Sequence, residues 1–266
     1  MTSFDFGICA TQGQRNYQED SAIVWPGEAT FAWDGAVAAQ PDAAGLLAVL
    51  ADGMGGHVGG ALASRTVCEA FVRSYLDAGQ DGEVRDRGLS ALFDGNGHIT
   101  EIVRNDPSLD GMGSTLVGAI FGSEGLEWIS VGDSPLYLVR RDEIALLNED
   151  HSLAPALDKL AAEGRISKEE ARNDPRRHML RSAITGEELD LIDVSKKPLQ
   201  LEPGDYVIVA SDGIHTLEDQ EIVRLVSGYG GDGPLAVAQA IVRAIDNYRA
   251  PHQDNATVIA VRPSFS

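Results

Sequence analysis

The sequence predicts an α+β fold in which amphipathic helices pack on antiparallel sheets. Four apolar runs of strand length follow one another with short polar turns between them. They are residues 113–121, 126–131, 137–140 and 144–147. Short connections of this kind join antiparallel neighbours, because parallel neighbours need a long crossover. Apolar side chains recur at helical spacing over residues 58–78, 89–103 and 234–248, which predicts helices lying on the sheets.

Size and composition limit the classes of protein to consider. The chain has 266 residues, 43% of them hydrophobic, which is ample for a large core. We find neither an internal repeat nor a long linker, so we expect one domain over residues 1–266. The formal charge of -20 opposes contact with nucleic acid or an anionic membrane, because phosphate contacts need clustered Lys and Arg.

The absence of targeting signals and the low cysteine content indicate a reducing compartment. No run of about 18 apolar residues is present, and the first residues lack a signal-peptide pattern. We therefore expect a cytoplasmic protein. Cys9 and Cys68 lie within apolar patterns and are too few for a disulfide framework, which favours buried thiols.

The remaining elements follow in chain order. The alternation over residues 4–11 predicts a first strand, and residues 21–25 a second. The Ala-, Gly- and Pro-rich residues 26–45 are interpreted as a surface excursion without an assigned role. Further strands are expected at residues 46–51, 191–194, 206–211 and 257–261, and further helices at 153–162, from a capping box at Ser167, and from a cap at Thr216 to Val226.

Four apolar runs end at an aspartate or begin after one. The acids at these strand ends are Asp52, Asp133, Asp212 and Asp254. Asp-Gly is also the commonest tight-turn dipeptide, so any one of these acids alone would indicate a turn. Their repetition at strand ends far apart in the sequence predicts a shared cleft.

A group of aspartates in one cleft favours hard divalent cations. Carboxylates are hard oxygen ligands, and neither clustered His nor Cys accompanies them, so Mg²⁺ or Mn²⁺ is expected rather than Zn²⁺. Without a cation, mutual repulsion and desolvation would raise the free energy of the site. Two such ions would activate a water molecule toward phosphorus, and the planar donors of Arg15 suit phosphate oxygens. The residues therefore indicate metal-assisted hydrolysis of a phosphate ester.

Other catalytic signatures fail. No Gly-Lys pair marks a phosphate-binding loop, and residues 111–116 lack the third glycine of a dinucleotide fingerprint. Residues 132–136 lack the closing glycine of a nucleophile elbow, and the aspartate spacing does not fit a calcium loop.

Two charged segments accompany the strand-end acids. The turn at residues 14–20 carries Arg15 beside the adjacent acids Glu19 and Asp20, which repel each other unless a cation lies near; a solvent-exposed loop is the alternative. A flap is expected over about residues 151–190. Its cations Arg176, Arg177 and His178 would meet an anionic substrate or, in the interpretation we favour, pair with local carboxylates.

Seven motifs in a fixed order give the chain a close resemblance to the metal-dependent protein serine/threonine phosphatases of type 2C, in their bacterial single-domain form. The motifs are residues 15–20, 52–56, 113–115, 131–134, 150–152, 211–213 and 254–255. The resemblance implies a four-layer αββα sandwich, two central antiparallel sheets between outer helices. It also implies a centre of two Mn²⁺ or Mg²⁺ ions in a cleft at one end, whose bridging water attacks phosphoserine or phosphothreonine.

The same resemblance implies roles for individual residues. Asp52 would bridge both metals, the Gly53 carbonyl would bind the second, and Asp212 and Asp254 would hold the first. Glu19 and Asp20 would lie beside the pair, Asp133 would help hold a weaker third ion, and Arg15 would bind phosphate.

Three features depart from the common pattern of this family. Met54 stands where animal members carry a histidine proposed as general acid, Pro135 replaces a frequent arginine, and residues 26–45 look long. The leaving-group proton would then come from metal-bound water or another group.

The resemblance also implies partners. Phosphorylated Ser/Thr proteins would be the substrates of a monomeric enzyme that opposes a kinase of the same cell. A catalytically silent phosphoprotein-binding module and a small-molecule phosphatase are the alternatives.

Overall fold

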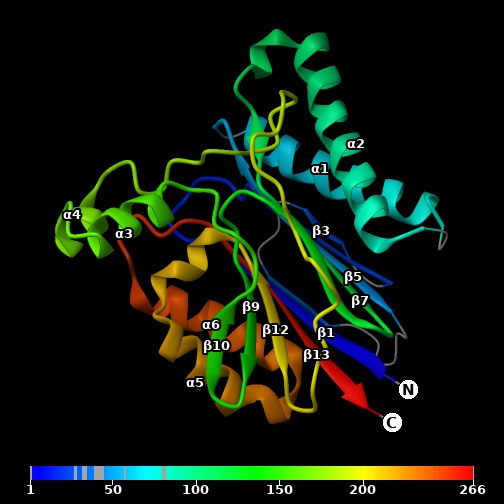
Figure 1. Ribbon diagram of the computed structural model, residues 1–266, viewed down its shortest axis with the longest axis vertical. Coiled ribbons are helices and arrows are strands. Elements are labelled where there is room, and N and C mark those ends of the chain that lie inside the picture. The colour runs from blue at the N-terminus through cyan, green and yellow to red at the C-terminus, as the bar shows by residue number, and fades with distance from the viewer. Residues whose placement is uncertain are drawn as a thin grey trace.

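The computed structural model describes residues 2–26, 29–31, 35–38, 45–56, 58–79 and 82–265. Its strands form two antiparallel sheets (Figure 1). The first has the order β10-β9-β12-β13-β1-β4, from Glu143–Leu146, Leu136–Arg140, Tyr206–Ala210, Ala256–Phe265, Thr2–Thr11 and Gly35–Ala38. The second has the order β11-β8-β7-β5-β2-β3, from Asp193–Val194, Gly125–Val131, Leu116–Gly122, Leu46–Met54, Asp20–Trp25 and Ala29–Phe31; the short β6, Gly113–Ser114, pairs with β5.

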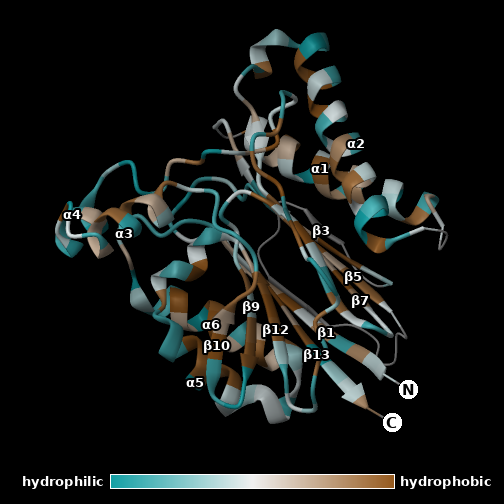
Figure 2. Cartoon of the chain, in the orientation of Figure 1, coloured by the Kyte–Doolittle hydropathy of each residue, from teal (hydrophilic) through white to brown (hydrophobic). Residues whose placement is uncertain are grey.

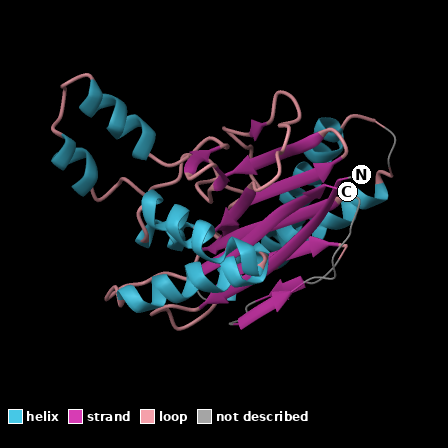
Figure 3. Cartoon of the chain, turned by 90° about the horizontal axis from the view of Figure 1, so that it is seen from below, coloured by secondary structure: helices cyan, strands magenta, loops and turns pink. Residues whose placement is uncertain are grey.

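Helices cover the outer faces of both sheets. Helices α1 (Val58–Asp77) and α2 (Val84–Asn105) pack on β5 and β8, whereas α5 (Asp219–Tyr229) and α6 (Pro234–Tyr248) cover the other sheet. Seen from below, strands lie between the helical layers (Figure 3). The predicted αββα sandwich is therefore confirmed.

The core occupies three layers that follow from the buried faces of the strands. Between the sheets, Phe4, Ile8 and Ile259 of one meet Leu50 and Val117 of the other. Each outer layer joins a sheet to its helix pair. The strands are accordingly the most hydrophobic part of the chain in Figure 2. Burial of this apolar area, at about 25 cal/mol per Å², is what holds the layers together.

The flap stands apart from the sandwich. Helices α3 (Ala154–Ala162) and α4 (Lys168–Asn173) form a pair that projects to one side (Figures 1 and 3). The predicted capping box at Ser167 is confirmed: its Oγ accepts a hydrogen bond from Glu170 N, and Glu170 Oε2 accepts one from Ser167 N.

Two expectations need correction. The predicted cap at Thr216 is wrong, because α5 begins after Glu218 without a side-chain cap and Thr216 Oγ1 donates to Gln253 instead. Residues 26–45 also have a structural role: where described, they supply β3 and β4, one edge strand for each sheet.

The termini identify one end of the sandwich. Thr2 pairs with Phe265 at one end of the β1–β13 ladder, and Thr11 pairs with Ala256 at the other.

No helix in the described part of the chain has the length and apolar character needed to cross a lipid bilayer. Cys9 and Cys68 are buried free thiols, as predicted.

Candidate active site

Strand β5 ends in a cleft of about 720 Å³ at the end of the sandwich away from the termini. Asp52 stands opposite Asp20 of β2 in the antiparallel register, so strand pairing alone places these two acids side by side. The backbone of Asp52 is held on its other edge by Thr115: Asp52 N donates to Thr115 Oγ1 at 3.0 Å, and Thr115 N donates to Asp52 O at 2.9 Å.

Gly53 is tightly enclosed by backbone. A Cβ added at this residue would lie 2.1 Å from the carbonyl oxygen of Gly60 in α1 and 2.7 Å from that of Glu19. Gly53 N donates to Glu19 O at 3.1 Å. Only glycine lets the strand, the helix and the Glu19 turn approach this closely, which fixes Asp52 and the Gly53 carbonyl at the cleft.

Asp20 joins the two sheets at the base of the site. Its Oδ2 atom accepts hydrogen bonds from Ser211 Oγ at 2.7 Å and Thr257 Oγ1 at 2.8 Å. Thr257 belongs to β13 of the opposite sheet, and Ser211 directly follows β12 of that sheet. Ser211 Oγ accepts in turn from Thr257 N. Asp20 is buried, and it therefore lies behind the cleft wall rather than at its surface.

Asp212 and Asp254 come from the opposite sheet. Asp212 begins the short 3-10 helix η2 (Asp212–Thr216), two residues after the end of β12, and Asp254 lies two residues before the start of β13. Both line the cleft with Asp52 and Gly53. Arg15 forms an ion pair with Asp254.

Asn255 fixes the turn that carries Arg15 and Glu19. Its Nδ2 donates to the carbonyls of Gln12 and Tyr17, each at 2.9 Å, and its Oδ1 accepts from Glu19 N at 2.8 Å. Sequence reasoning placed Asn255 in a motif without a role. Three side-chain bonds to one loop become evident only when β1 and β13 are paired.

Asp133 also lines the cleft. The residues around it are held from two sides: Thr115 Oγ1 and Ser134 Oγ lie 2.7 Å apart, and His151 Nδ1 accepts from Gly132 N at 3.2 Å. Thr115 thus bonds both Asp52 and the Asp133 loop. The interpretation of residues 113–115 and 150–152 as motifs now has a physical basis, since both support acid-bearing loops.

Burial raises the pKa of four acids in and behind the cleft, and neighbouring carboxylates add to the effect: Asp20, Asp52, Asp133 and Asp212. The pKa of Asp20 rises to about 7, that of Asp133 to about 7, and that of Asp212 to about 6, in each case chiefly by desolvation. The pKa of Asp52 is raised well above its usual range, first by burial and then by Asp20, Asp212, Asp133 and Asp254. These acids therefore lie close enough to repel one another.

The chemistry of the donor set fits hard cations. In the described part of the chain, Oδ1 of Asp20 and Oδ1 of Asp212 are buried and accept no hydrogen bond. Buried oxygens normally have partners, and a divalent cation would supply one while offsetting the repulsion. The ligand positions are not preformed, because no group of three or more described His, Cys, Asp or Glu side chains is arranged to hold a metal. Arg15 occupies one oxygen of Asp254.

The flap cations divide into two groups. Arg176 pairs with Asp174 at 2.8 Å and Arg177 with Asp158 at 2.8 Å, so both make local ion pairs and neither lines the cleft. His178 does line it, together with Arg181, which sequence reasoning missed. Glu19 also lines the cleft.

Comparison with known proteins places the chain in a family. A family model described as protein phosphatase 2C matches residues 32–229. The serine/threonine protein phosphatase PstP of Mycobacterium tuberculosis is 32% identical over 216 residues, which is 80% of this chain and 39% of PstP. The serine/threonine phosphatase stp of Listeria welshimeri is 34% identical over 226 residues, 81% of this chain and 83% of that protein.

Solved structures agree. The M. tuberculosis phosphatase PstP superposes with a TM-score of 0.77 at 27% identity, covering 98% of each chain. The catalytic domain of PstP in complex with two manganese ions gives a TM-score of 0.76 at 26% identity, covering 100% of each chain. The chain therefore belongs to the protein phosphatase 2C family. It spans about two fifths of the length of the curated PstP proteins it matches.

Proposed function

We propose that this chain is a metal-dependent protein phosphatase that hydrolyses phosphoserine and phosphothreonine. The observation that carries the proposal is the convergence of Asp52, Asp212 and Asp254 on one cleft, with Asp20 buried behind its wall. In the described part of the chain, Oδ1 of Asp20 and Oδ1 of Asp212 are buried and accept no hydrogen bond. Family membership and the two manganese ions of the PstP catalytic domain support it.

The residues of the site would have separate roles. Asp52, the Gly53 carbonyl, Asp212 and Asp254 would hold two Mn²⁺ or Mg²⁺ ions, with Glu19 and Asp20 beside them and Asp133 available to a third. When bound, the ions would supply Lewis-acid stabilisation and an activated water for attack on phosphorus. Asp20, bonded by Ser211 and Thr257, would hold the two sheets in register beneath the site.

Arg15 is suited to bind the phosphate. Its side chain is 52% exposed at the cleft, and one terminal nitrogen contacts Asp254. A guanidinium has five N–H donors, so most remain for phosphate oxygens. Met54 also lines the cleft and cannot donate a proton, so the leaving-group proton must come from another source.

Turnover tests the proposal directly. Purified protein is expected to hydrolyse a phosphothreonine peptide and an aryl phosphate in millimolar Mn²⁺, and to lose both activities in chelator. Asp52→Asn should lower the rate by more than the roughly 10- to 100-fold that loss of an outer-shell partner costs. Asp77→Asn, an exposed aspartate outside the cleft, is the matched control.

The other outcomes identify the alternatives. Peptide binding without turnover would indicate a silent phosphoprotein-binding module, and equal rates for wild type and Asp52→Asn would remove catalysis from this cleft. Faster hydrolysis of phosphorylated metabolites than of peptides would indicate a small-molecule phosphatase.

We further propose a monomeric cytoplasmic protein, with one domain over residues 1–266, that opposes a Ser/Thr kinase of the same cell. The buried free thiols Cys9 and Cys68 support the reducing compartment. Size-exclusion chromatography with light scattering would test the monomer, and fractionation of cells the location.

A further inference from the structure

One wall of the cleft carries three exposed carboxylates that the proposed chemistry does not use. Glu187, Glu188 and Asp190 all line the cleft and are exposed to solvent. Arg140, Arg176 and Arg177 form ion pairs with other acids. In the described part of the chain, no Lys, Arg or His forms an ion pair with Glu187, Glu188 or Asp190. The acidic wall, defined as these three residues, therefore has charge available for another molecule.

The acidic wall is held in place by helix α2. Thr100 Oγ1 donates to Gly186 O at 2.7 Å, Gly186 N donates to Asn96 Oδ1 at 2.9 Å, and Asn96 Nδ2 donates to Glu187 O at 2.8 Å. Gly186 has φ +85°, and a Cβ added there would lie 2.7 Å from Thr100 N. Three hydrogen bonds and this close approach fix the backbone from which the acids project.

The same loop is tied to the strand that carries Asp52. Ile184 N donates to Ser114 O at 2.8 Å and Ser114 N donates to Ile184 O at 3.0 Å, while Ser114 pairs with Gly53. Two backbone pairings thus connect the acidic wall to the proposed metal ligands. The distance between wall and site is set by the fold.

The cleft is itself a place where a ligand fits. Asp212 lines it, and its buried Oδ1 accepts no hydrogen bond from the described residues. The cleft is also lined by the cations His178 and Arg181, and Ser182 bonds Leu191, which places Arg181 close to the Asp190 end of the acidic wall. A phosphorylated segment lying in the cleft would have its phosphate at Arg15 and its flanking residues beside three negative charges.

We propose that the acidic wall selects phosphopeptides that carry Lys or Arg close to the phosphorylated residue. The inference rests on the proposed phosphatase function and adds a substrate class to it. The wall attracts cationic side chains and repels acidic ones, and charge pairing across an interface chiefly gives specificity and association rate. Each exposed pair contributes a factor of roughly two to five.

The test compares matched peptides. A phosphothreonine peptide with one Arg is assayed in Mn²⁺ against the same peptide with Gln, moving the substituted position from four residues before to four after the phosphothreonine. At the best position, kcat/KM for the Arg peptide is expected to exceed that for the Gln peptide by about fivefold. The preference should weaken at high salt, because screening acts on exposed charges.

Variants assign the preference to the acidic wall. The triple variant Glu187→Gln, Glu188→Gln, Asp190→Asn is expected to bring the Arg/Gln ratio of kcat/KM close to one. The control is Asp77→Asn, Glu124→Gln, Asp232→Asn, which changes the net charge equally at exposed acids outside the cleft and should keep the wild-type ratio.

The outcomes separate this inference from the proposed function. Failure to hydrolyse any peptide would remove the function on which the inference rests. Hydrolysis with equal kcat/KM for Arg and Gln peptides at every position would overturn the inference and leave the phosphatase in place. A preference that survives in the wall variant, or falls equally in the control, would also overturn it.

Discussion

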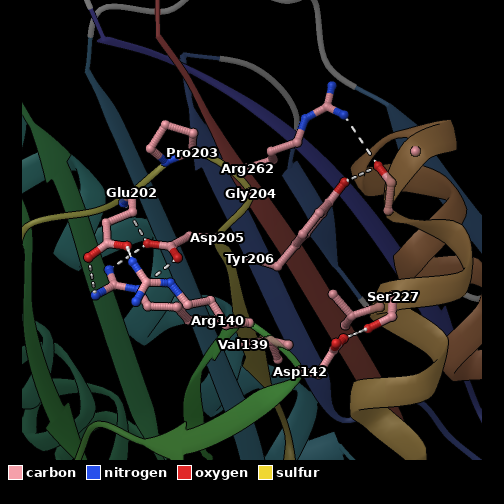
Figure 4. A pocket seen from close by; sticks show the side chains of 14 residues that line it. Val139, Arg140, Asp142, Glu202, Pro203, Gly204, Asp205, Tyr206, Ser227 and Arg262 are labelled. Atoms are coloured by element: carbon pink, nitrogen blue, oxygen red, sulfur yellow. Dashed lines mark hydrogen bonds and ion pairs between the residues drawn. The ribbon is translucent and has the colours of Figure 1, made fainter.

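Strand β12 carries a charged cavity at each end, and the two cavities differ in how their charges are paired. Beyond Ala210 lies the cleft of Asp52 and Asp212, where two buried carboxylate oxygens, Oδ1 of Asp20 and of Asp212, accept no hydrogen bond from any residue that the structure describes. At Tyr206, the other end, lies a cavity of about 510 Å³ whose side chains pair with each other (Figure 4).

The pairing in the second cavity is extensive. Arg140 binds Asp205 through Nε at 2.8 Å and a terminal nitrogen at 2.6 Å, and Glu202 accepts from both Arg140 and Arg141. Figure 4 shows Arg140, Glu202 and Asp205 facing one another. Tyr206 OH donates to the Gly230 carbonyl at 2.6 Å. A hollow with arginines therefore does not by itself indicate an anion site. The cleft of Asp52 and Asp212 differs because, among the described residues, Oδ1 of Asp20 and Oδ1 of Asp212 are buried there without a hydrogen-bond partner.

Glycine packing gives the largest predicted difference between the two ends. A Cβ at Gly213 would lie 2.1 Å from the carbonyl oxygen of Asn255, whereas one at Gly231, beside the second cavity, meets nothing within 4 Å. Gly213→Ala must therefore displace Asp212 or Asn255. We expect it to lower the free energy of unfolding by about 3 kcal/mol, the upper range for overpacking, and to reduce turnover at least tenfold.

Gly231→Ala is the matched control and should leave turnover and the urea midpoint unchanged. Phosphatase assays and urea denaturation measure both variants. Wild-type turnover in a folded Gly213→Ala protein would show that the spacing of Asp212 and Asn255 is not critical.

The fold could be predicted well from the sequence because strand periodicity and helix periodicity are local signals. The start of α2 was missed by five residues: the prediction began at residue 89, and the helix begins at Val84. Gly88 explains the miss. It lies inside the first turns, where glycine weakens a helix signal, yet an added Cβ would meet Ile129 Cδ1 at 2.2 Å. Tertiary packing there overrides local propensity.

In the candidate site, too, the residues marked by a local sequence pattern were predicted and those that act through tertiary contacts were not. The strand-end acids were found because apolar runs end at them, and register then brings Asp20 opposite Asp52. Asn255, Ser211 and Thr257 received no role, because each acts through a bond to another strand or loop. The acidic wall was missed because its position depends on hydrogen bonds to α2. Contacts between distant segments leave no local pattern.

Removal of Arg140 tests the cavity at Tyr206, where the charged side chains pair with one another. The Asp205 side chain is 1% exposed, so loss of its cation leaves a buried carboxylate whose remaining donor among the described residues is the Glu202 N–H. We expect Arg140→Leu to lower the free energy of unfolding by about 2 kcal/mol, less than the 3–5 typical of a fully buried pair because Arg140 is partly exposed. Mn²⁺-dependent turnover should stay at the wild-type level. A loss of turnover in the folded variant would contradict the separation of the two ends.

Removal of the charge of Asp20, behind the cleft, should instead raise the free energy of unfolding when no metal is bound. Asp20 has its pKa raised to about 7, chiefly by burial, against an ordinary value of 3.8. Its ionisation therefore costs stability, and this cost grows as pH rises from about 4 to 7. In chelator at about pH 8, Asp20→Asn should raise the free energy of unfolding by about 1 kcal/mol. The gain should shrink near pH 5, where the folded wild type is already protonated.

Added Mn²⁺ reverses the comparison. Wild type should gain thermal stability and Asp20→Asn should gain less, because a ligand that binds only the folded state stabilises it. Thermal melts at several pH values, with chelator and with Mn²⁺, measure both effects. A variant less stable than wild type in chelator at pH 8 would show that the bonds from Ser211 and Thr257 outweigh the repulsion.

Arg141 provides the smallest expected effect. It pairs with Glu202, but its side chain is 79% exposed and that of Glu202 is 42% exposed. Exposed pairs contribute little because water screens both charges, so Arg141→Gln should change the free energy of unfolding by no more than about 0.5 kcal/mol. Urea denaturation of this variant beside Arg140→Leu compares two arginines that share one acid and differ in burial. If the two variants lost equal free energy of unfolding, the burial of Asp205 would not be what makes the Arg140 ion pair the more stabilising of the two.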